Sequence, residues 1–172
     1  MPDSLRAAIR DVVDFPQPGI VFKDITPILA DAELFRRSIS LLCATAGGAR
    51  IDKVVGIDAR GFIFASAVAD RLGAGFVPLR KQGKLPWKTR QTAYALEYGE
   101  GIVEIHEDAV KPGEVVLLVD DLLATGGTAA AAVKLLEQLG ATLIGVSFLI
   151  ELSFLNGRSK LQPYPVHSIL IY

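Results

Sequence analysis

Residues 115–128 read Val-Val-Leu-Leu-Val-Asp-Asp-Leu-Leu-Ala-Thr-Gly-Gly-Thr. The apolar run at 115–119 has no polar alternation, which is typical of a strand buried on both faces within a parallel sheet. Asp120 and Asp121 follow this run directly. We therefore expect both carboxylates at the edge of the sheet where α/β proteins bind ligands.

The turn after the two acids has the composition of a phosphate site, and it consists of Ala124, Thr125, Gly126, Gly127 and Thr128. Its glycines let backbone N–H groups come close to an anion, its threonines add hydroxyl donors, and the helix expected after it favours negative charge. No lysine follows the glycines, which excludes a nucleotide-triphosphate P-loop. The acids precede the turn, which excludes a dinucleotide fingerprint. Paired carboxylates beside a monophosphate cradle suit the hydroxyls of a ribose 5-phosphate.

Strands and helices alternate on both sides of this segment. Hydrophobic periodicity predicts strands over residues 53–57, 75–79 and 143–150, and helices over residues 32–46, 62–72 and 128–139. A glycine follows each helix, and Asp31 precedes the first as its expected N-cap. The alternation predicts a doubly wound, mainly parallel sheet that is flanked by helices, in a single domain over residues 1–172.

The N-terminal residues predict one more helix. The apolar residues that recur there at helical spacing are Leu5, Ala8, Ile9, Val12 and Val13. Pro16 and Pro18 should end that helix and lead into an extended turn over residues 17–24.

Residues 80–106 depart from the alternation. They are rich in charged and aromatic side chains, and residues 92–105 alternate around a Tyr-Gly-Glu-Gly turn as a β-hairpin does. A connection of this length between sheet strands is more often functional than decorative. We therefore expect a flexible hairpin flap over the active site at about residues 80–106; a decorative hairpin is the alternative.

Composition excludes several classes of protein. The 172 residues are 51% hydrophobic and 22% charged with a net charge of −1, which excludes a disordered chain and argues against a nucleic-acid partner. The single Cys43 can form no intramolecular disulfide, which fits a reducing compartment. No signal-peptide pattern is present, and the longest apolar stretch, 143–150, is far below the roughly 18 residues that span a bilayer. We expect a cytoplasmic protein without a membrane partner.

Beyond these patterns, residues 116–129 resemble the phosphoribosyl-pyrophosphate motif of the type I phosphoribosyltransferases. Further segments are similar to those of the adenine phosphoribosyltransferases: DFP at 14–16 with FKDITP at 22–27, GIDARGF at 56–62, RKQGKLP at 80–86 and LEYG at 96–99. The resemblance covers nearly the whole chain, in order. It implies an enzyme of purine salvage that transfers the 5-phosphoribosyl group from phosphoribosyl pyrophosphate to adenine, giving AMP and pyrophosphate.

The resemblance also implies roles at the sugar end of the site. Residues 124–128 would hold the 5'-phosphate, while Asp120 and Asp121 would accept hydrogen bonds from the ribose hydroxyls and favour positive charge on the ring. Mg²⁺ is the implied cofactor, held by the substrate and meeting these two acids through water, with no direct protein ligand. The cations implied for the leaving pyrophosphate are Arg60, Arg80, Lys81 and Lys84. In this family some residues of the 80–86 segment reach a neighbouring subunit's site, which implies a homodimer.

At the base end, backbone groups of Val21, Phe22 and Lys23 are implied to read the adenine edge. The commoner family form has arginine at position 23, so a stacking role for a guanidinium is lost here, whereas a backbone contact is kept. Glu97 matches the flap acid that takes the proton from the purine imidazole ring, and Tyr98 beside it would help to exclude water. The implied catalytic residues are Glu97, Arg60, Asp120 and Asp121.

Two alternatives stay open. A related enzyme could act on a 6-oxopurine, which presents a carbonyl acceptor where adenine presents an amino donor, and a buried site built for one pattern rejects the other. The segments at 21–27 and 97–98 favour adenine. A non-catalytic sensor of phosphoribosyl pyrophosphate is less favoured, because such a protein needs a nucleic-acid-binding module or a basic face, and length and charge indicate neither.

Overall fold

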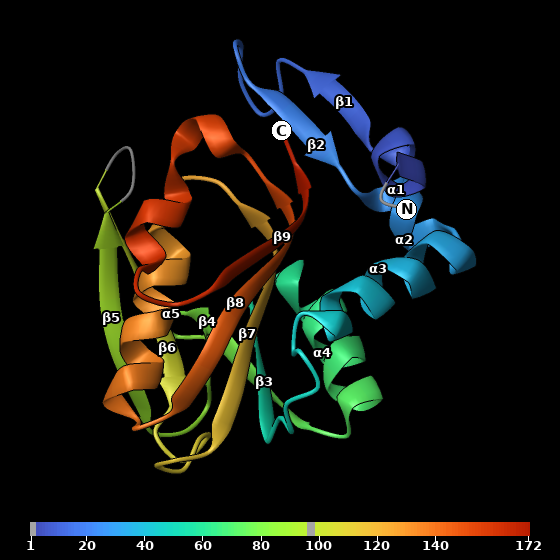
Figure 1. Ribbon diagram of the computed structural model, residues 1–172. Coiled ribbons are helices and arrows are strands. Elements are labelled where there is room, and N and C mark those ends of the chain that lie inside the picture. The colour runs from blue at the N-terminus through green and yellow to red at the C-terminus, as the bar shows by residue number, and fades with distance from the viewer. Residues whose placement is uncertain (1–2, 96–98) are drawn as a thin grey trace. The chain divides into compact units, whose positions relative to one another are not determined.

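The computed structural model describes residues 3–95 and 99–172 (Figure 1). The chain divides into two compact units, Met1–Leu41 and Leu42–Tyr172. Helix α3 (Ala32–Ala44) runs across the boundary between them. Among the residues that the structure describes, no helix is long and apolar enough to cross a membrane.

The first unit opens with helix α1 (Asp3–Ala8) and an antiparallel hairpin of β1 (Arg10–Val13) and β2 (Val21–Asp24). The predicted N-terminal helix is therefore wrong beyond Ala8, and part of the expected turn is a strand. Two ion pairs cross the hairpin, from Lys23 Nζ to Asp11 Oδ1 at 2.7 Å and from Arg10 to Asp24 at 3.5 Å. The β-branched residues of β1 satisfy helical and strand spacing alike, and pairing with β2 decides between them.

Helix α2 (Thr26–Ala30) follows, and then α3, which ends two residues before the predicted bound. Asp31 caps α3 as predicted, because its Oδ1 accepts hydrogen bonds from the backbone N–H groups of Glu33 and Leu34, both at 2.9 Å.

The second unit is built on a seven-stranded mixed sheet in the order β5-β6-β4-β3-β7-β8-β9. Its strands are β3 (Lys53–Ile57), β4 (Gly75–Lys81), β5 (Thr89–Ala95), β6 (Glu100–His106), β7 (Val115–Leu123), β8 (Thr142–Glu151) and β9 (Val166–Ile171). The strands from β4 to β9 in this order pair in parallel, whereas β6 pairs antiparallel with both β4 and β5. The expected mainly parallel α/β sheet is confirmed.

Helices α4 (Gly61–Leu72) and α5 (Gly127–Gln138) lie on opposite faces of this sheet (Figure 1). This follows from the strand order, because the β3–α4–β4 and β7–α5–β8 crossovers run in opposite directions and share one hand. Between the helices, residues 116–119 of β7 are fully buried, as their apolar run predicts.

Strand β7 continues four residues beyond the predicted bound at 119, so Asp120 and Asp121 lie within the strand rather than after it. Asp120 is paired in register with Phe148 of β8. The predicted hairpin is present as β5 and β6, which pair from Thr89 opposite His106 to Ala95 opposite Glu100. Glu97 and Tyr98 lie outside the described residues.

The 3₁₀ helices η1 (Ser153–Leu155) and η2 (Gly157–Leu161) connect β8 to β9. The sequence patterns predicted neither these two turns nor β9.

Candidate active site

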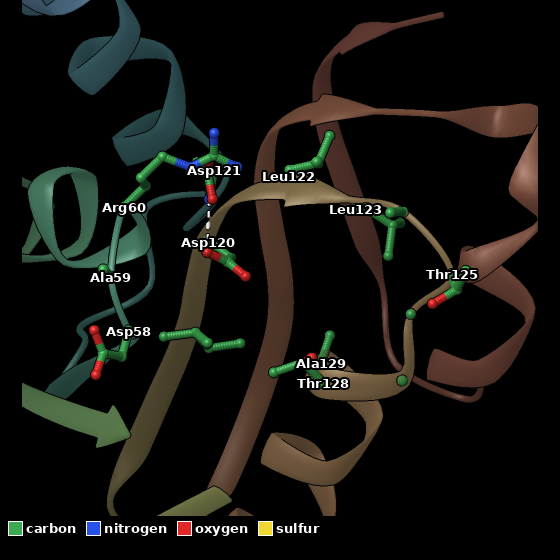
Figure 2. Close-up of a pocket in the computed structure, with 14 residues that line it drawn as sticks. Asp58, Ala59, Arg60, Asp120, Asp121, Leu122, Leu123, Thr125, Thr128 and Ala129 are labelled. Atoms are coloured by element: carbon green, nitrogen blue, oxygen red, sulfur yellow. Dashed lines mark hydrogen bonds and ion pairs between the residues drawn. The ribbon is translucent and has the colours of Figure 1, made fainter. Parts of the chain in front are cut away.

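A cavity of about 330 Å³ opens at the carboxyl ends of β3 and β7 (Figure 2). One wall is the β3–α4 connection, residues 58–60, and the other is the end of β7 with the turn that starts α5, residues 120–129. All five residues of the predicted phosphate turn line it, as do the two predicted acids and Arg60. The predicted sugar and phosphate residues therefore meet in one place.

Arg60 and Asp121 join the two walls. Arg60 reaches across from the start of α4, and its Nε lies 2.8 Å from Asp121 Oδ2 (Figure 2). Asp121 is buried, whereas 38% of the Arg60 side chain is exposed. A carboxylate held this way is fixed in orientation by a charge-assisted hydrogen bond.

Asp120 has different surroundings. Its Oδ1 accepts a hydrogen bond from the Asp121 backbone N–H at 2.8 Å. The same oxygen occupies the space that a Cβ at position 61 would need, so only glycine there admits this carboxyl. Burial, and after it the negative charge of Asp121, raises the pKa of Asp120 well above its ordinary value, and Arg60 offsets this only in part.

The phosphate turn has a left-handed residue at Gly126, with φ of +80°, and α5 begins at the next residue. The N–H groups of the first helical turn have no partner within a helix, so they are suited to bind an anion. The turn also packs against the backbone of Gly157, which does not line the cavity.

The three cations of residues 80–84 differ in their surroundings. Arg80 does not line the cavity itself, but its Nε lies 2.9 Å from Oδ2 of Asp58, which does. Lys81 and Lys84 are exposed and do not line the cavity.

A buried carboxylate, Glu104 on β6, fixes the backbone beside Lys84. Its Oε1 accepts hydrogen bonds from the backbone N–H groups of Lys84 at 3.2 Å and Leu85 at 2.9 Å. Its Oε2 accepts from the side chains of Thr89 at 3.4 Å and Gln91 at 3.1 Å. Burial alone would raise the pKa of Glu104, but hydrogen bonds from the backbone at Leu85, Gly83 and Lys84 and from the Gln91 side chain outweigh burial and lower it.

The residues expected to read adenine lie on β2 in the first unit. Val21 is exposed, while Phe22 and Lys23 are half-buried. The Phe22 ring packs edge-on against Phe15 with centroids 5.1 Å apart, and Lys23 forms the ion pair with Asp11.

Sequence analysis included Asp58, Ala59 and Gly61 in the GIDARGF segment without giving them a role of their own, and it missed Glu104 and Gly157. Asp58 and Ala59 follow a predicted strand directly, so their position at the same sheet edge as Asp120 could have been found. Glu104 and Gly157 act through tertiary contacts, for which the local sequence holds no signal.

The sheet edge, the paired acids and the phosphate turn together define the class of this protein, a phosphoribosyltransferase. The family model of the phosphoribosyl transferase domain matches residues 24–165. The chain is 58% identical over 172 residues, all of both chains, to the adenine phosphoribosyltransferase of Anaeromyxobacter dehalogenans (strain 2CP-C). The chain belongs to the adenine phosphoribosyltransferase family.

Solved structures of adenine phosphoribosyltransferases have the same fold over nearly the whole chain. The crystal structure of adenine phosphoribosyltransferase from Rhodothermus marinus DSM 4252 has a TM-score of 0.95 at 50% identity, covering 99% of this chain and 98% of that one. The Saccharomyces cerevisiae enzyme has a TM-score of 0.93 at 42% identity, covering 98% and 97%, and was solved in complex with an imino-altritol bisphosphate and adenine.

Proposed function

We infer that this chain transfers the 5-phosphoribosyl group from phosphoribosyl pyrophosphate to adenine, giving AMP and pyrophosphate in purine salvage. The observation that carries this function is the cavity where Asp120, Asp121, Arg60 and the phosphate turn meet, in a chain of the adenine phosphoribosyltransferase family. In the reaction, the bond from ribose C1 to the pyrophosphate oxygen breaks and a bond from adenine N9 to C1 forms. The N9 proton passes to a base.

For the sugar phosphate, we propose that residues 124–128 bind the 5'-phosphate through backbone and hydroxyl donors at the start of α5. Asp120 and Asp121 accept hydrogen bonds from the ribose hydroxyls. Their negative charge stabilises the positive charge that develops on the ring as the C1–O bond breaks.

For the leaving group, we propose that Arg60, which lines the cavity, and Arg80, which lies behind Asp58, provide cationic donors; both pair with cavity-lining aspartates. Lys81 and Lys84 are proposed to add charge from the exposed segment that follows β4. Guanidinium groups suit pyrophosphate because they donate two parallel hydrogen bonds.

Mg²⁺ is the proposed cofactor. The part of the chain that the structure describes holds no group of three His, Cys, Asp or Glu side chains that could bind a metal ion. The carboxylate oxygens of Asp120 and Asp121 on the cavity wall fit an ion that keeps most of its waters and takes its other ligands from substrate phosphates. When bound, the ion would neutralise charge on the pyrophosphate.

At the base, Val21, Phe22 and Lys23 are proposed to recognise adenine, and Glu97 to accept the N9 proton. Tyr98 would help to keep water from the activated sugar. These assignments rest on the match of these residues to family motifs.

We further propose a single phosphoribosyltransferase domain over residues 1–172, which acts as a homodimer in the cytoplasm. Ile63 and Phe76 are exposed on α4 and β4, and the neighbouring Phe62 ring contacts both Phe76, with centroids 5.6 Å apart, and Arg80, at 5.9 Å. An apolar surface next to the cationic segment suits a subunit contact there. The single Cys43 suits the reducing cytoplasm.

The test is product formation from phosphoribosyl pyrophosphate and Mg²⁺, with each purine base offered separately. We expect AMP from adenine and no nucleotide from hypoxanthine, guanine or xanthine. The Asp120→Asn/Asp121→Asn protein, purified in the same way, measures any contaminating activity. A 6-oxopurine nucleotide as the product would contradict the assignment of the base. Absence of every nucleotide, with substrate binding intact, would support a sensor.

A further inference from the structure

The segment that follows β8 forms the back wall of the phosphate turn. Gly157 is buried, and a Cβ at Gly126 would lie 2.5 Å from the Gly157 carbonyl oxygen. A Cβ at Gly157 would in turn overlap the carbonyl oxygen of Ala124 and lie 3.0 Å from Gly126 N. The two backbones therefore touch without side chains between them, and any shift of Gly157 moves the turn.

An ion pair fixes the residue next to Gly157. The guanidinium of Arg158 binds the Glu151 carboxylate through two hydrogen bonds, from Nε to Oε1 at 3.1 Å and from Nη2 to Oε2 at 2.5 Å. Its Nη1 donates to the Val166 carbonyl at 2.6 Å, and Nη2 also lies 3.3 Å from Ser168 Oγ. Arg158 thus links the end of β8 to two positions on β9.

The pair keeps its charges across the ordinary pH range. Hydrogen bonding to Arg158 lowers the pKa of Glu151, although Glu151 is buried, and the same contact raises the pKa of Arg158. Neither side chain lines the cavity. The pair is therefore not part of the cavity surface. The two hydrogen bonds within the pair and the two contacts from Arg158 to β9 hold both side chains in one geometry.

We propose that Glu151 and Arg158 are positioning residues that act through Gly157 to hold the phosphate turn in the conformation that binds a 5'-phosphate. This role rests on the proposed function of residues 124–128. A turn whose N–H groups already converge on one point binds phosphate without first losing conformational freedom. Loosening its back wall should therefore weaken phosphate binding and leave the pyrophosphate side, at Arg60 and Arg80, unchanged.

The experiment compares two ligands on the same variants by titration calorimetry: ribose 5-phosphate, and pyrophosphate with Mg²⁺. For Glu151→Gln and Arg158→Lys we expect the affinity for ribose 5-phosphate to fall about ten- to a hundredfold, with the affinity for pyrophosphate within about twofold of wild type. In the assay, the KM for phosphoribosyl pyrophosphate should rise more than kcat falls. Gly157→Ala, which leaves the ion pair intact and moves the turn directly, should give the same selective loss.

Glu137→Gln is the matched control. It removes the same charge from an acid that accepts a hydrogen bond from Tyr164 Oη at 2.7 Å, but this acid lies near the far end of α5. Its affinities for both ligands should match those of wild type.

Unchanged ribose 5-phosphate affinity in Glu151→Gln, or in Gly157→Ala should the former not fold, overturns the proposal. An equal loss for both ligands also overturns it, because it indicates general loosening. A wild-type protein that binds ribose 5-phosphate but makes no AMP would contradict the proposed function alone.

Discussion

Asp120 and Asp121 are adjacent in β7, yet their carboxylates have different electrostatic surroundings. Asp121 is paired with Arg60 at 2.8 Å, whereas Asp120 is half-buried at the cavity wall, where desolvation and the like charge of Asp121 raise its pKa. A carboxylate that is desolvated beside a like charge lowers the stability of the folded state at neutral pH, because its charged form is disfavoured there. Residues that are needed for catalysis often lower the stability of the folded protein.

Asp120→Asn should therefore stabilise the ligand-free protein at neutral pH while it removes activity. Asparagine keeps the oxygen that accepts from the Asp121 N–H, and it has no charge. We expect the melting temperature to rise by about 2–8 °C, which corresponds to about 1–2 kcal/mol in a chain of this size. Calorimetry in the presence of a chelator measures the melting temperature, and the AMP assay should show a loss of about a hundredfold or more.

The pH dependence of this stability gain tests whether the charge of Asp120 is its cause. The folded state favours protonated Asp120, so wild-type stability from this group is present below the unfolded pKa of about 3.9 and is lost as pH rises through the higher folded pKa. The advantage of Asp120→Asn should be small in acid and grow with pH. An advantage that is constant with pH would show that charge is not its cause.

Glu97→Gln should reduce turnover by about 10²–10⁴-fold, because an amide cannot accept the N9 proton. Binding of phosphoribosyl pyrophosphate should stay close to wild type, since Glu97 is proposed to act on the base alone. Steady-state kinetics and calorimetry separate the two quantities. Glu100→Gln, an exposed acid at the start of β6, is the matched control. Near-normal turnover in Glu97→Gln would remove Glu97 from its role.

At the scale of elements, sequence periodicity predicted the strands and helices of the parallel core closely. Strand β3 has the predicted bounds, and α4 and α5 each begin one residue early. Such segments bury continuous apolar faces, so their local sequence and their tertiary surroundings agree. Strand β1 was mistaken for helix because four residues are too few to separate the two periods, and only pairing with β2 decides.

The residues of the candidate site also fall into two groups, those that the sequence could predict and those that it could not. The phosphate turn and the acids could be predicted because one continuous segment supplies them, and the sheet carries that segment to its carboxyl edge. Glu104 and the pair of Glu151 and Arg158 could not, because each acts on residues brought near by folding. A single acid in an apolar strand has no distinguishing local pattern.

At this scale we also expect Glu104 to protect the backbone of the segment between β4 and β5 from hydrogen exchange. Glu104→Gln removes one of two acceptor oxygens and the charge, so the backbone amides of Lys84 and Leu85 should exchange hydrogen about tenfold faster at neutral pH. Because its folded pKa is lowered, protection in wild type should be present above the unfolded pKa and be lost as pH falls through the lower folded pKa. Hydrogen exchange of residues 82–91 measures both effects.

The control for that measurement is again Glu100→Gln, which changes an exposed acid on the same strand. It should leave the exchange of these amides unchanged. Protection in Glu104→Gln equal to that of wild type would show that the hydrogen bonds of Glu104 do not hold this segment.

At the scale of the whole molecule, the proposed roles are spread along the chain. The first unit carries the residues proposed to read the base, and the second carries the cavity proposed to bind the sugar and its phosphate. Lys81 and Lys84 lie outside the cavity of their own chain, on exposed backbone beside Arg80. Cations placed in this way can complete the site of a second subunit across a two-fold contact.

The proposed homodimer therefore predicts that two inactive variants complement each other. We would mix the Lys81→Ala/Lys84→Ala protein with the Glu97→Gln protein and refold the mixture so that subunits exchange. If the lysines serve the partner and Glu97 serves its own subunit, each hybrid dimer has one wild-type site. Random pairing makes half of the dimers hybrid, so about one quarter of wild-type activity should return. A mixture as inactive as its components would place both lysines at the site of their own subunit.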